Sequence, residues 1–402
     1  MKIRGLAAIG VLGLGAAVAQ AFGRFAYGVL LPAVRDDLSI SNTVAGSLGT
    51  INVGAYLAGT VAVAAAASRF RLLSIMRFGL VTSTLGLTLS AVATGPDVLA
   101  VAMFLSGFGG AIVWIPTPAI AAGSVAPERR SLAIALLGSG IGLGVVFVSQ
   151  LTSIVRSSLG DESWRTAYVV MALIAVVTTS ITVLSIDHDQ APPAGGKSQL
   201  GGFATLRRMR GWFPLTVTYT AFGLMYLLVM AFLVTRLEDD NGWTSSDASL
   251  TFTLVGLATV VGGPLFIALA GRVGPALSLA VAFGAWTILV LIVLPGWWAP
   301  TLAASAGLGL VFSGVPSMVT LYVVANTSVE DYGPSFAAAT LCFGVAQMLS
   351  PQLGGLVADL TGSFLPVFLL SSAVAVIGLV AALGLPRTVS EPPAATPVRD
   401  LG

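Results

Sequence analysis

The sequence predicts an all-α integral membrane protein with twelve transmembrane helices, arranged as two related six-helix bundles. Hydrophobic residues make up 56% of the 402 residues and charged residues only 9%, whereas soluble domains carry about 25% charged residues. The apolar runs are long enough to cross the hydrocarbon core, which takes about 20 residues of helix. Lipid cannot satisfy free backbone groups, and the runs lack the alternation of barrel strands. Each run is therefore expected to be a helix.

The apolar runs, read against the polar residues between them, give the helices in chain order. They are expected at residues 5–34, 44–67, 72–93, 98–123, 130–154, 165–186, 212–235, 248–270, 275–295, 299–324, 334–358 and 363–385. The longest polar break contains Pro, Gly, Lys and Arg and separates six spans from six. These boundaries predict an N-terminal bundle at 1–186, a cytoplasmic linker at 187–210, a C-terminal bundle at 211–386 and a cytoplasmic tail at 387–402.

The distribution of basic residues predicts the orientation. If the N-terminus is cytoplasmic, most of the 19 Lys and Arg residues also fall on the cytoplasmic side. This asymmetry indicates that both termini are cytoplasmic, in the inner (plasma) membrane. The apolar run after Lys2 and Arg4 continues past a signal-like Ala-Gln-Ala to Leu31, so we expect a span there and no cleavage. The basic residues on the other side are Arg35, Arg156, Arg165 and Arg236, and Arg24 lies inside a span.

The composition also excludes several functional classes. The single histidine, His188, and the single cysteine, Cys342, cannot build a disulfide, a metal cluster or a histidine-based catalytic site. The glycine-dense stretch GSGIGLG has no preceding strand and no following Lys, so it predicts helix packing instead of phosphate binding. We therefore expect no enzyme activity, no cofactor, no metal and no nucleic-acid partner, in a monomer embedded in the lipid bilayer.

An internal repeat supports the two-bundle arrangement. Three pairs of stretches match at a common offset of between 200 and 204 residues. A parallel repeat of this kind predicts a pseudo-twofold axis along the membrane normal, with a cavity between the halves. The pairs are AFGRFAYGVLLPAVRDD with AFGLMYLLVMAFLVTRLEDD, SRFR with GRVG, and SLAIALLGSG with SFAAATLCFG.

The twelve spans, the duplicated half, the basic turn after span 2 and the glycine-dense span 5 resemble the major facilitator superfamily over essentially the whole chain. GRFAYGVLLP and SPQLGGLVADLTGS resemble its YbfB/YjiJ-like branch. The resemblance implies that spans 1, 4, 7 and 10 line a central path and that Arg69 and Arg272 contribute to gating. The sequence departs from the superfamily pattern because Ser68 and Gly271 stand where an aspartate normally precedes the arginine, and because span 4 lacks its frequent arginine.

Arg24 is the most informative polar residue, because placing an arginine near a span centre costs about 2.5 to 3.5 kcal/mol. In an α-helix, Gln20, Arg24 and Tyr27 share one face, which predicts a wet cavity beside them. The repeat aligns Leu224 with Arg24, so the scaffold does not require this charge. A guanidinium keeps its proton and pairs well with carboxylates. Two other roles stay open: bonding carbonyls of a broken helix within its own bundle, or gating contacts toward Asp36 and Asp37.

Other polar residues inside spans are weaker candidates for the same cavity, because each could equally serve helix packing or a kink. Asn52 and Tyr56 are i, i+4 partners in span 2, and Trp114 precedes two prolines in span 4. The remaining substrate-binding candidates are Tyr219, Tyr226, Ser317 and Gln347. The gating or conformational candidates are Arg69, Arg272, Gly138, Gly142 and Asp359, an acid near the end of a span.

Three functional hypotheses follow. The first is a secondary active or facilitative transporter that moves a small organic anion, expected to be a carboxylate, by alternating access. The second is an efflux transporter for amphipathic drugs or metabolites, using an aromatic-lined cavity. The third, a membrane receptor that transports nothing, lacks the large extramembrane segment that signalling would need. The apolar runs hold no acid except near their ends, which argues against proton antiport of cationic drugs by a carboxyl of the protein. Anion exchange, facilitated diffusion and proton symport stay open.

Overall fold

Each predicted span is a helix in the computed structural model, which describes residues 5–186 and 202–387. Within these ranges, twelve helices are long and apolar enough to cross a membrane. Lys2, Arg4, His188 and the predicted tail beyond residue 387 lie outside the described residues. The N-terminal half contains α1 (Leu6–Ala16), the π-helix η1 (Ala17–Phe25), α2 (Ala26–Asp37), α3 (Asn42–Ala66), α4 (Leu72–Ala91), α5 (Pro96–Trp114), α6 (Thr117–Gly123), η2 (Pro127–Arg129), α7 (Arg130–Leu159), η3 (Asp161–Ser163) and α8 (Trp164–Ser185).

The C-terminal half begins with a short helix, α9, that the sequence analysis had placed in the linker. Residues 187–201 of that linker lie outside the described residues, whereas α9 packs against α15. The elements of this half are α9 (Gly202–Arg208), α10 (Trp212–Met230), α11 (Leu233–Asp239), α12 (Ser245–Val273), α13 (Pro275–Val293), α14 (Trp298–Asn326), α15 (Val329–Thr361) and α16 (Leu365–Leu383).

Local sequence signals explain where several spans begin. Ser41, Thr244 and Ser328 cap α3, α12 and α15, because each side-chain oxygen accepts a hydrogen bond from the backbone N–H three residues later. The prediction for span 11 began the helix five residues too late, at Pro334. The helix begins at Val329, after the Ser328 cap, and contains Pro334.

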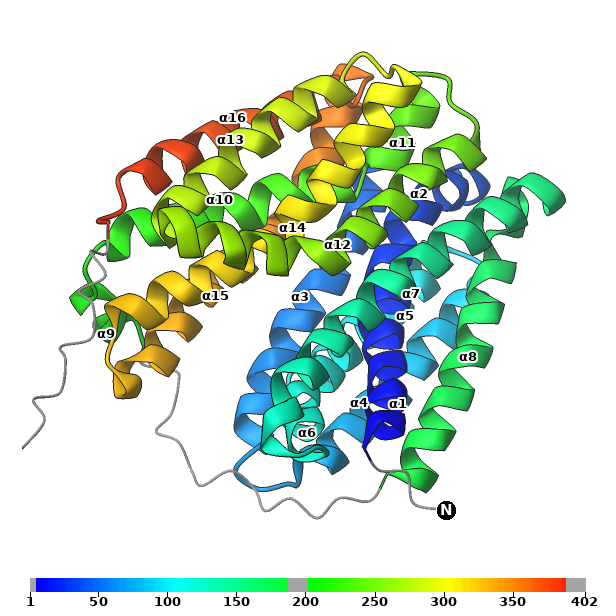
Figure 1. The fold of residues 1–402 in the computed structure, drawn as a ribbon. Helices are drawn as coiled ribbons and strands as arrows, with labels where there is room; N and C mark the ends of the chain where they lie inside the picture. Colours follow the sequence, from blue (N-terminus) through cyan, green and yellow to red (C-terminus); the bar gives the residue numbers. More distant parts are fainter. Residues whose placement is uncertain (1–4, 187–201, 388–402) are drawn as a thin grey trace, which may run out of the picture.

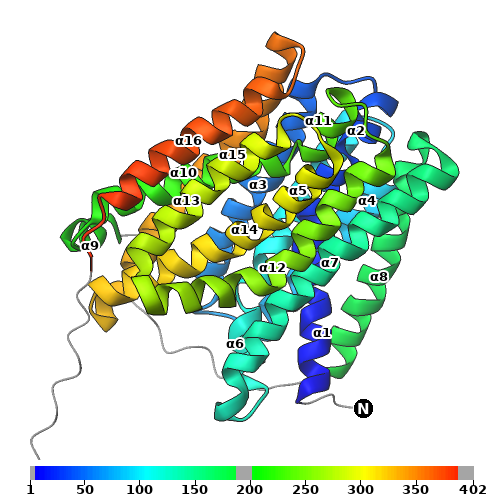
Figure 2. The ribbon, with the colours of Figure 1, turned by 45° about the horizontal axis from the view of Figure 1, so that its top comes forward.

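Two contacts between the halves are related to each other by the internal repeat. The helix α3 packs against α15, and α7 packs against α12, which are the equivalent pairs expected from a pseudo-twofold axis. Figure 1 shows the halves side by side near α2 and α11 and spreading apart toward α6 and α9, and Figure 2 shows the same arrangement from another side.

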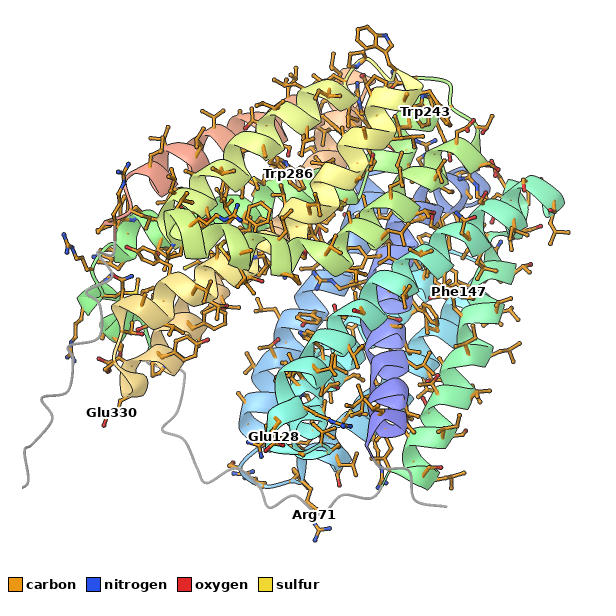
Figure 3. The ribbon with its side chains drawn as sticks, viewed as in Figure 1. Arg71, Glu128, Phe147, Trp243, Trp286 and Glu330 are labelled. Atoms are coloured by element: carbon orange, nitrogen blue, oxygen red, sulfur yellow. The ribbon has the colours of Figure 1, made fainter. Side chains whose placement is uncertain are left out.

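The membrane-spanning helices end at two faces of the molecule. We call the end where α1 and α10 begin and α8 and α16 end the terminal face, and the other end the distal face. Figure 3 places Arg71 and Glu128 of the N-terminal half, and Glu330 of the C-terminal half, at the terminal face. Trp243 lies toward the distal face. The halves therefore converge at the distal face and diverge toward the terminal face.

Candidate functional site

The first span changes helix type where it carries its polar residues. Residues Ala17–Phe25 form a π-helix, in which the N–H of Ala26 donates to the carbonyl of Ala21, five residues back. Single π-turns inside α-helices are frequent at functional sites. Beside this stretch, the Tyr56 ring of α3 lies 4.7 Å from the Arg24 guanidinium carbon.

Arg24 crosses from the N-terminal half to two partners in the C-terminal half. Its Nη2 donates to the Tyr226 hydroxyl oxygen at 3.2 Å and to Gln347 Oε1 at 3.1 Å. The Tyr226 hydroxyl donates to the same Gln347 oxygen at 2.6 Å, which closes the triangle. Among the described residues, no carboxylate pairs with Arg24. In the part of the chain that the structure describes, its partners are two neutral acceptors and the face of one aromatic ring.

An aromatic wall lies on the C-terminal side of this triangle. Phe343 stacks on Tyr219 with ring centroids 4.6 Å apart, and Phe222 stacks on Tyr226 at 5.1 Å. Phe312 of α14 touches Tyr226 and, from the other half, Phe25. Arg24 therefore faces neutral polar groups set among aromatic rings.

Two buried amides of the N-terminal half lie at the irregular turn, and one of them supports it. The Nδ2 of Asn52 donates to the carbonyl oxygens of Gly23 and Met103, at 2.9 and 3.0 Å, so this predicted binding residue holds the backbone next to Arg24. Gln20 is buried, and its Nε2 has no hydrogen-bond partner among the described residues. A buried donor without a partner is costly, so Gln20 Nε2 is an unsatisfied polar group beside the irregular turn.

A cavity extends from Arg24 toward the distal face, between the two halves. Its volume is about 40 Å³, whereas one water molecule needs about 10 to 15 Å³ on the same measure. Arg24 is the one cationic side chain in the lining, and the Tyr27 hydroxyl that borders the cavity donates to the Ala45 carbonyl at 2.8 Å. The lining is Arg24, Phe25, Tyr27, Gly28, Leu31, Ala45, Gly46, Gly49, Asn52, Val53, Leu227, Met230, Ala231 and Pro351.

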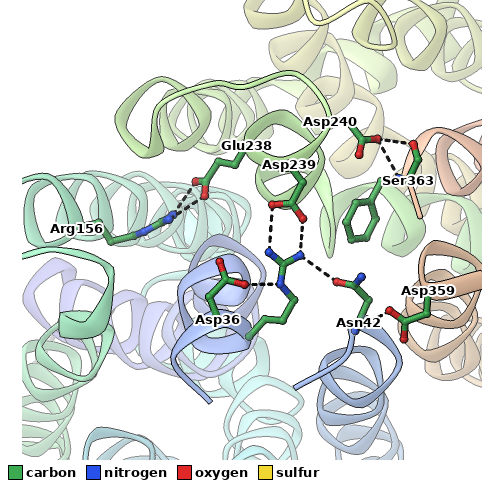
Figure 4. Close-up of polar contacts among 10 residues, drawn as sticks. Asp36, Asn42, Arg156, Glu238, Asp239, Asp240, Asp359 and Ser363 are labelled. Atoms are coloured by element: carbon green, nitrogen blue, oxygen red, sulfur yellow. Dashed lines mark hydrogen bonds and ion pairs between the residues drawn. The ribbon is translucent and has the colours of Figure 1, made fainter. Parts of the chain in front are cut away.

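Ion pairs between the halves close the distal face beyond this cavity. Arg35 binds both oxygens of the Asp239 carboxylate and also bonds Asp36 and Asn42. Arg156 binds both oxygens of Glu238 at 2.7 and 2.8 Å, and its side chain is only 2% exposed. Figure 4 shows both pairs side by side. Bidentate pairs of this kind are the strong, geometrically specific ones, so they hold the halves together here.

Asp359 closes the same face from α15. Its carboxylate accepts hydrogen bonds from the backbone N–H groups of Asn42 and Thr43 at 3.0 and 2.7 Å and from the Thr43 hydroxyl at 2.6 Å. It therefore caps the N-terminus of α3 from the other half, where the helix dipole favours a negative charge. The backbones also meet, since a Cβ at Gly46 would overlap the carbonyl of Pro351.

Comparisons with known proteins show the family and the fold of the chain. A sequence model of the family described as "Uncharacterised MFS-type transporter YbfB" matches residues 16–383. The chain belongs to this family. Its twelve spans and two related halves are the fold of a major facilitator superfamily (MFS) transporter, which confirms both the predicted fold class and the resemblance.

Among curated proteins, this YbfB-type transporter is similar to human monocarboxylate transporter 11, with 26% identity over 339 residues that cover 78% of this chain and 69% of that protein. It is also 26% identical to human monocarboxylate transporter 6 over 278 residues, covering 61% and 53% of the two chains. Monocarboxylate transporter 13 of Bos taurus is 24% identical over 320 residues, covering 78% and 73%.

Among solved structures, the chain is similar to a bacterial homolog of the human lysosomal transporter Spinster, in an inward-facing and unoccupied conformation. The TM-score is 0.74 with 14% identity, over 95% of this chain and 98% of that one. The occupied, inward-facing form of the same homolog gives a TM-score of 0.70 with 15% identity, over 94% and 95% of the chains. At this identity the likeness shows the fold alone.

The other predicted substrate-binding residues of the YbfB-type transporter lie outside the Arg24 triangle. Tyr219 belongs to the aromatic wall, and Trp114 is half-buried at the end of α5. Ser317 donates to the carbonyl of Ser313 within its own helix, at 3.2 Å. Of the two other roles left open for Arg24, gating through the acids after span 1 finds no support, because Asp36 bonds Arg35 and Asp37 bonds Arg165.

The predicted gating residues are scattered over the transporter. Arg69 and Arg272 are exposed at the ends of α3 and α12 near the terminal face. A Cβ at Gly142 would lie 2.7 Å from the Gly256 carbonyl of the other half, whereas one at Gly138 would meet nothing within 4 Å. Gly142 therefore lies at the contact between α7 and α12, and a role for Gly138 stays a prediction. Among the described residues, no group of His, Cys, Asp or Glu could hold a metal ion.

The aromatic residues around the Arg24 triangle and the distal ion pairs were not predicted from the sequence. Phe25, Phe312 and Phe343 lie in apolar runs, where nothing distinguishes a cavity-facing ring from a lipid-facing one. Arg35 and Arg156 could have predicted ion pairs, since they are among the few basic residues on the side expected to be non-cytoplasmic. Such residues often pair with nearby acids, and EDD at 238–240 was the obvious candidate.

Proposed function

We propose that this transporter moves a small organic anion, a carboxylate, by alternating access, with Arg24 as the anion site. The observation that carries the proposal is a guanidinium within the first span, at the boundary between the halves and beside a cavity, with no acidic partner among the described residues. A carboxylate forms shorter and stronger hydrogen bonds with a guanidinium than neutral oxygens do. The relatives named monocarboxylate transporters support the same substrate class.

The hydrogen bonds that the Arg24 guanidinium already makes determine what a carboxylate must displace when it binds. Only Nη2 of Arg24 has hydrogen-bond partners among the described residues. Both bidentate edges of a guanidinium include Nη2, so an incoming carboxylate displaces Gln347 or Tyr226 from it. Binding thus breaks a contact between the halves and replaces it with a stronger one to the substrate. Through this exchange, an anion can change the balance between conformations.

The conformation of the distal face supports alternating access. In this state the distal face is closed by Arg35–Asp239 and Arg156–Glu238, and the halves diverge toward the terminal face. The excess of Lys and Arg at the terminal face favours a cytoplasmic location for that face in the inner (plasma) membrane. On this orientation the state described is open toward the cytoplasm, and transport requires the distal pairs to break.

Uptake of radiolabelled carboxylates by proteoliposomes tests the proposal. Replacing Arg24 by Gln removes the charge and should lower uptake by about 100-fold, since it removes two charge-assisted hydrogen bonds. Arg24→Lys keeps the charge but loses the fork, so intermediate uptake is expected. Arg208→Gln, an exposed residue of α9, is the matched control and should transport normally. Unchanged uptake by Arg24→Gln would rule out Arg24 as the anion site.

The aromatic wall favours a second candidate, export of amphipathic compounds. Tyr219, Phe222 and Phe343 could stack on a flat organic cation. In that case Tyr219→Ala would reduce drug resistance in cells that express the protein, while Arg24→Gln would leave it intact. The carboxylate proposal predicts no resistance phenotype for either variant.

A further inference from the structure

The cavity beyond Arg24 has a size and a surface that restrict what can occupy it. At about 40 Å³ it has room for about three water-sized groups. It ends toward the distal face where the halves touch: a Cβ on Gly28 would lie 2.9 Å from the Met230 carbonyl, and Gly46 meets the Pro351 carbonyl. A molecule held at Arg24 can therefore extend only a short distance in this direction.

The cavity surface offers carbon atoms and one cation. Leu31, Val53, Leu227 and Met230 contribute apolar side chains from α2, α3 and α10. Besides Arg24, the polar side chains in the lining are Tyr27 and Asn52, and both already have partners: the Tyr27 hydroxyl donates to Ala45, and the Asn52 amide donates to two backbone carbonyls. A second carboxylate or a hydroxyl placed here would lose its hydration without gaining partners, which is costly.

We propose that this cavity holds the short apolar chain of a monocarboxylate whose carboxylate is bound by Arg24, and that Val53 and Leu227 in its lining limit the volume open to that chain. The inference rests on the proposed function and adds the part of the substrate that is not charged. Val53 is 3% exposed and faces the cavity from α3, and Leu227 lines it from α10 in the other half. Selection by length and selection against a second charge then come from one small apolar cavity.

The experiment measures the affinity of the purified full-length protein for sodium propionate, butyrate, hexanoate, succinate and benzoate by titration calorimetry. The wild-type protein should bind propionate and butyrate and should reject succinate. Val53→Ala and Leu227→Ala enlarge the cavity, so two further methylenes become buried. The ratio of hexanoate affinity to propionate affinity should rise about tenfold in each variant, since each buried methylene contributes about 0.8 kcal/mol.

Val63→Ala is the matched control, because Val63 is buried in the same helix but packs with Ile75 and Ile112 away from the cavity. Its hexanoate-to-propionate ratio should equal that of the wild type. The inference is overturned if both cavity variants keep the wild-type ratio, or if succinate binds as tightly as butyrate. It is also overturned if benzoate binds tightest and Phe343→Ala abolishes that binding, since the substrate then lies along the aromatic wall.

Arg24→Gln separates this inference from the proposed function. If Arg24→Gln still binds propionate, or if the wild type binds none of these anions, the anion site itself is wrong. If Arg24→Gln loses binding while the cavity variants keep the wild-type chain-length profile, only the chain-length inference fails.

Discussion

At the scale of single residues, the site depends on the neutrality of the groups that hold Arg24. An arginine paired with an internal carboxylate would already be satisfied, and a substrate anion would compete with a charge of its own sign. Tyr226 and Gln347 supply oxygen atoms without a charge, so on the proposed function they bond Arg24 until a carboxylate displaces one of them. Hydrogen bonds from a charged donor to neutral groups contribute about 1.5 to 3 kcal/mol each.

Converting Gln347 to Glu tests this interpretation with an isosteric change. The new carboxylate would lie where Oε1 is now, 3.1 Å from Arg24 Nη2, and would act as an internal competitor. We expect the affinity for propionate at neutral pH to fall about 100-fold, with thermal stability maintained or raised. Calorimetry measures the affinity.

Gln352→Glu is the control for Gln347→Glu, because Gln352 is exposed on the same helix and the change adds the same charge. Its affinity for propionate should match that of the wild type. If Gln347→Glu binds propionate as well as the wild type does, the anion does not need the position that Gln347 occupies.

The sequence could predict part of this site. Gln20, Arg24, Tyr226 and Gln347 are polar residues inside apolar runs, and the energetic cost of burying them marked them for attention. The π-helix could not be predicted, because Ala17–Phe25 has no composition that separates it from an α-helix. The helix-face argument grouped Tyr27 with Arg24, and both do line the cavity, but the Tyr27 hydroxyl bonds Ala45.

At the scale of elements, closure of the distal face depends on a backbone contact between α3 and α15. Gly46→Ala would place a methyl group against the carbonyl of Pro351. Overpacking typically costs about 1 to 3 kcal/mol, which would shift the population of the closed face by about tenfold or more. Gly138→Ala is the matched control, because a Cβ there meets nothing within 4 Å.

Spin labels report this shift as a distance between the halves. Glu162 and Ser246 are exposed at the distal face, one in each half. Cysteines at these two positions, in a Cys342→Ser background, carry the labels. Gly46→Ala should lengthen the mean distance and Gly138→Ala should not. An unchanged distance in Gly46→Ala would show that this contact does not control closure.

At the scale of the whole molecule, the acid Glu238 makes the closed state depend on pH. Burial raises the pKa of Glu238 above its ordinary value, although Arg156 opposes the shift and the nearby Asp161 and Asp239 add to it. When the distal face opens, water returns the pKa toward the ordinary value. A proton then binds more tightly to the closed state, so closure is favoured as the pH falls through the interval between the two values.

The same spin labels test this dependence between pH 7 and about pH 5, a range that approaches the ordinary Glu pKa. The mean distance between the halves should shorten as the solution is acidified, and Glu238→Gln should remove the effect. Opening of the distal face on acidification would contradict the account, because it would mean that the Arg156 ion pair outweighs the cost of burial.

The overall architecture was the feature that the sequence predicted best. Apolar runs and a common repeat offset predicted twelve spans in two related halves, and the repeat also explains why α3 meets α15 and α7 meets α12. Contacts between the halves were not predictable in the same way. Asp359 lies near the end of a span in the sequence, and only the packing of α15 against α3 shows that it caps Asn42 and Thr43.

The central claim is that Arg24 binds a carboxylate whose chain enters the cavity toward the distal face. Crystals of the protein soaked with 3-bromopropionate test it most directly, because bromine is located by its anomalous scattering. We expect a carboxylate on the Arg24 guanidinium, with Gln347 displaced from it, and a bromine peak among Val53, Leu227 and Pro351. A bromine peak elsewhere in the protein, with Arg24 still bonded to Tyr226 and Gln347, would contradict it.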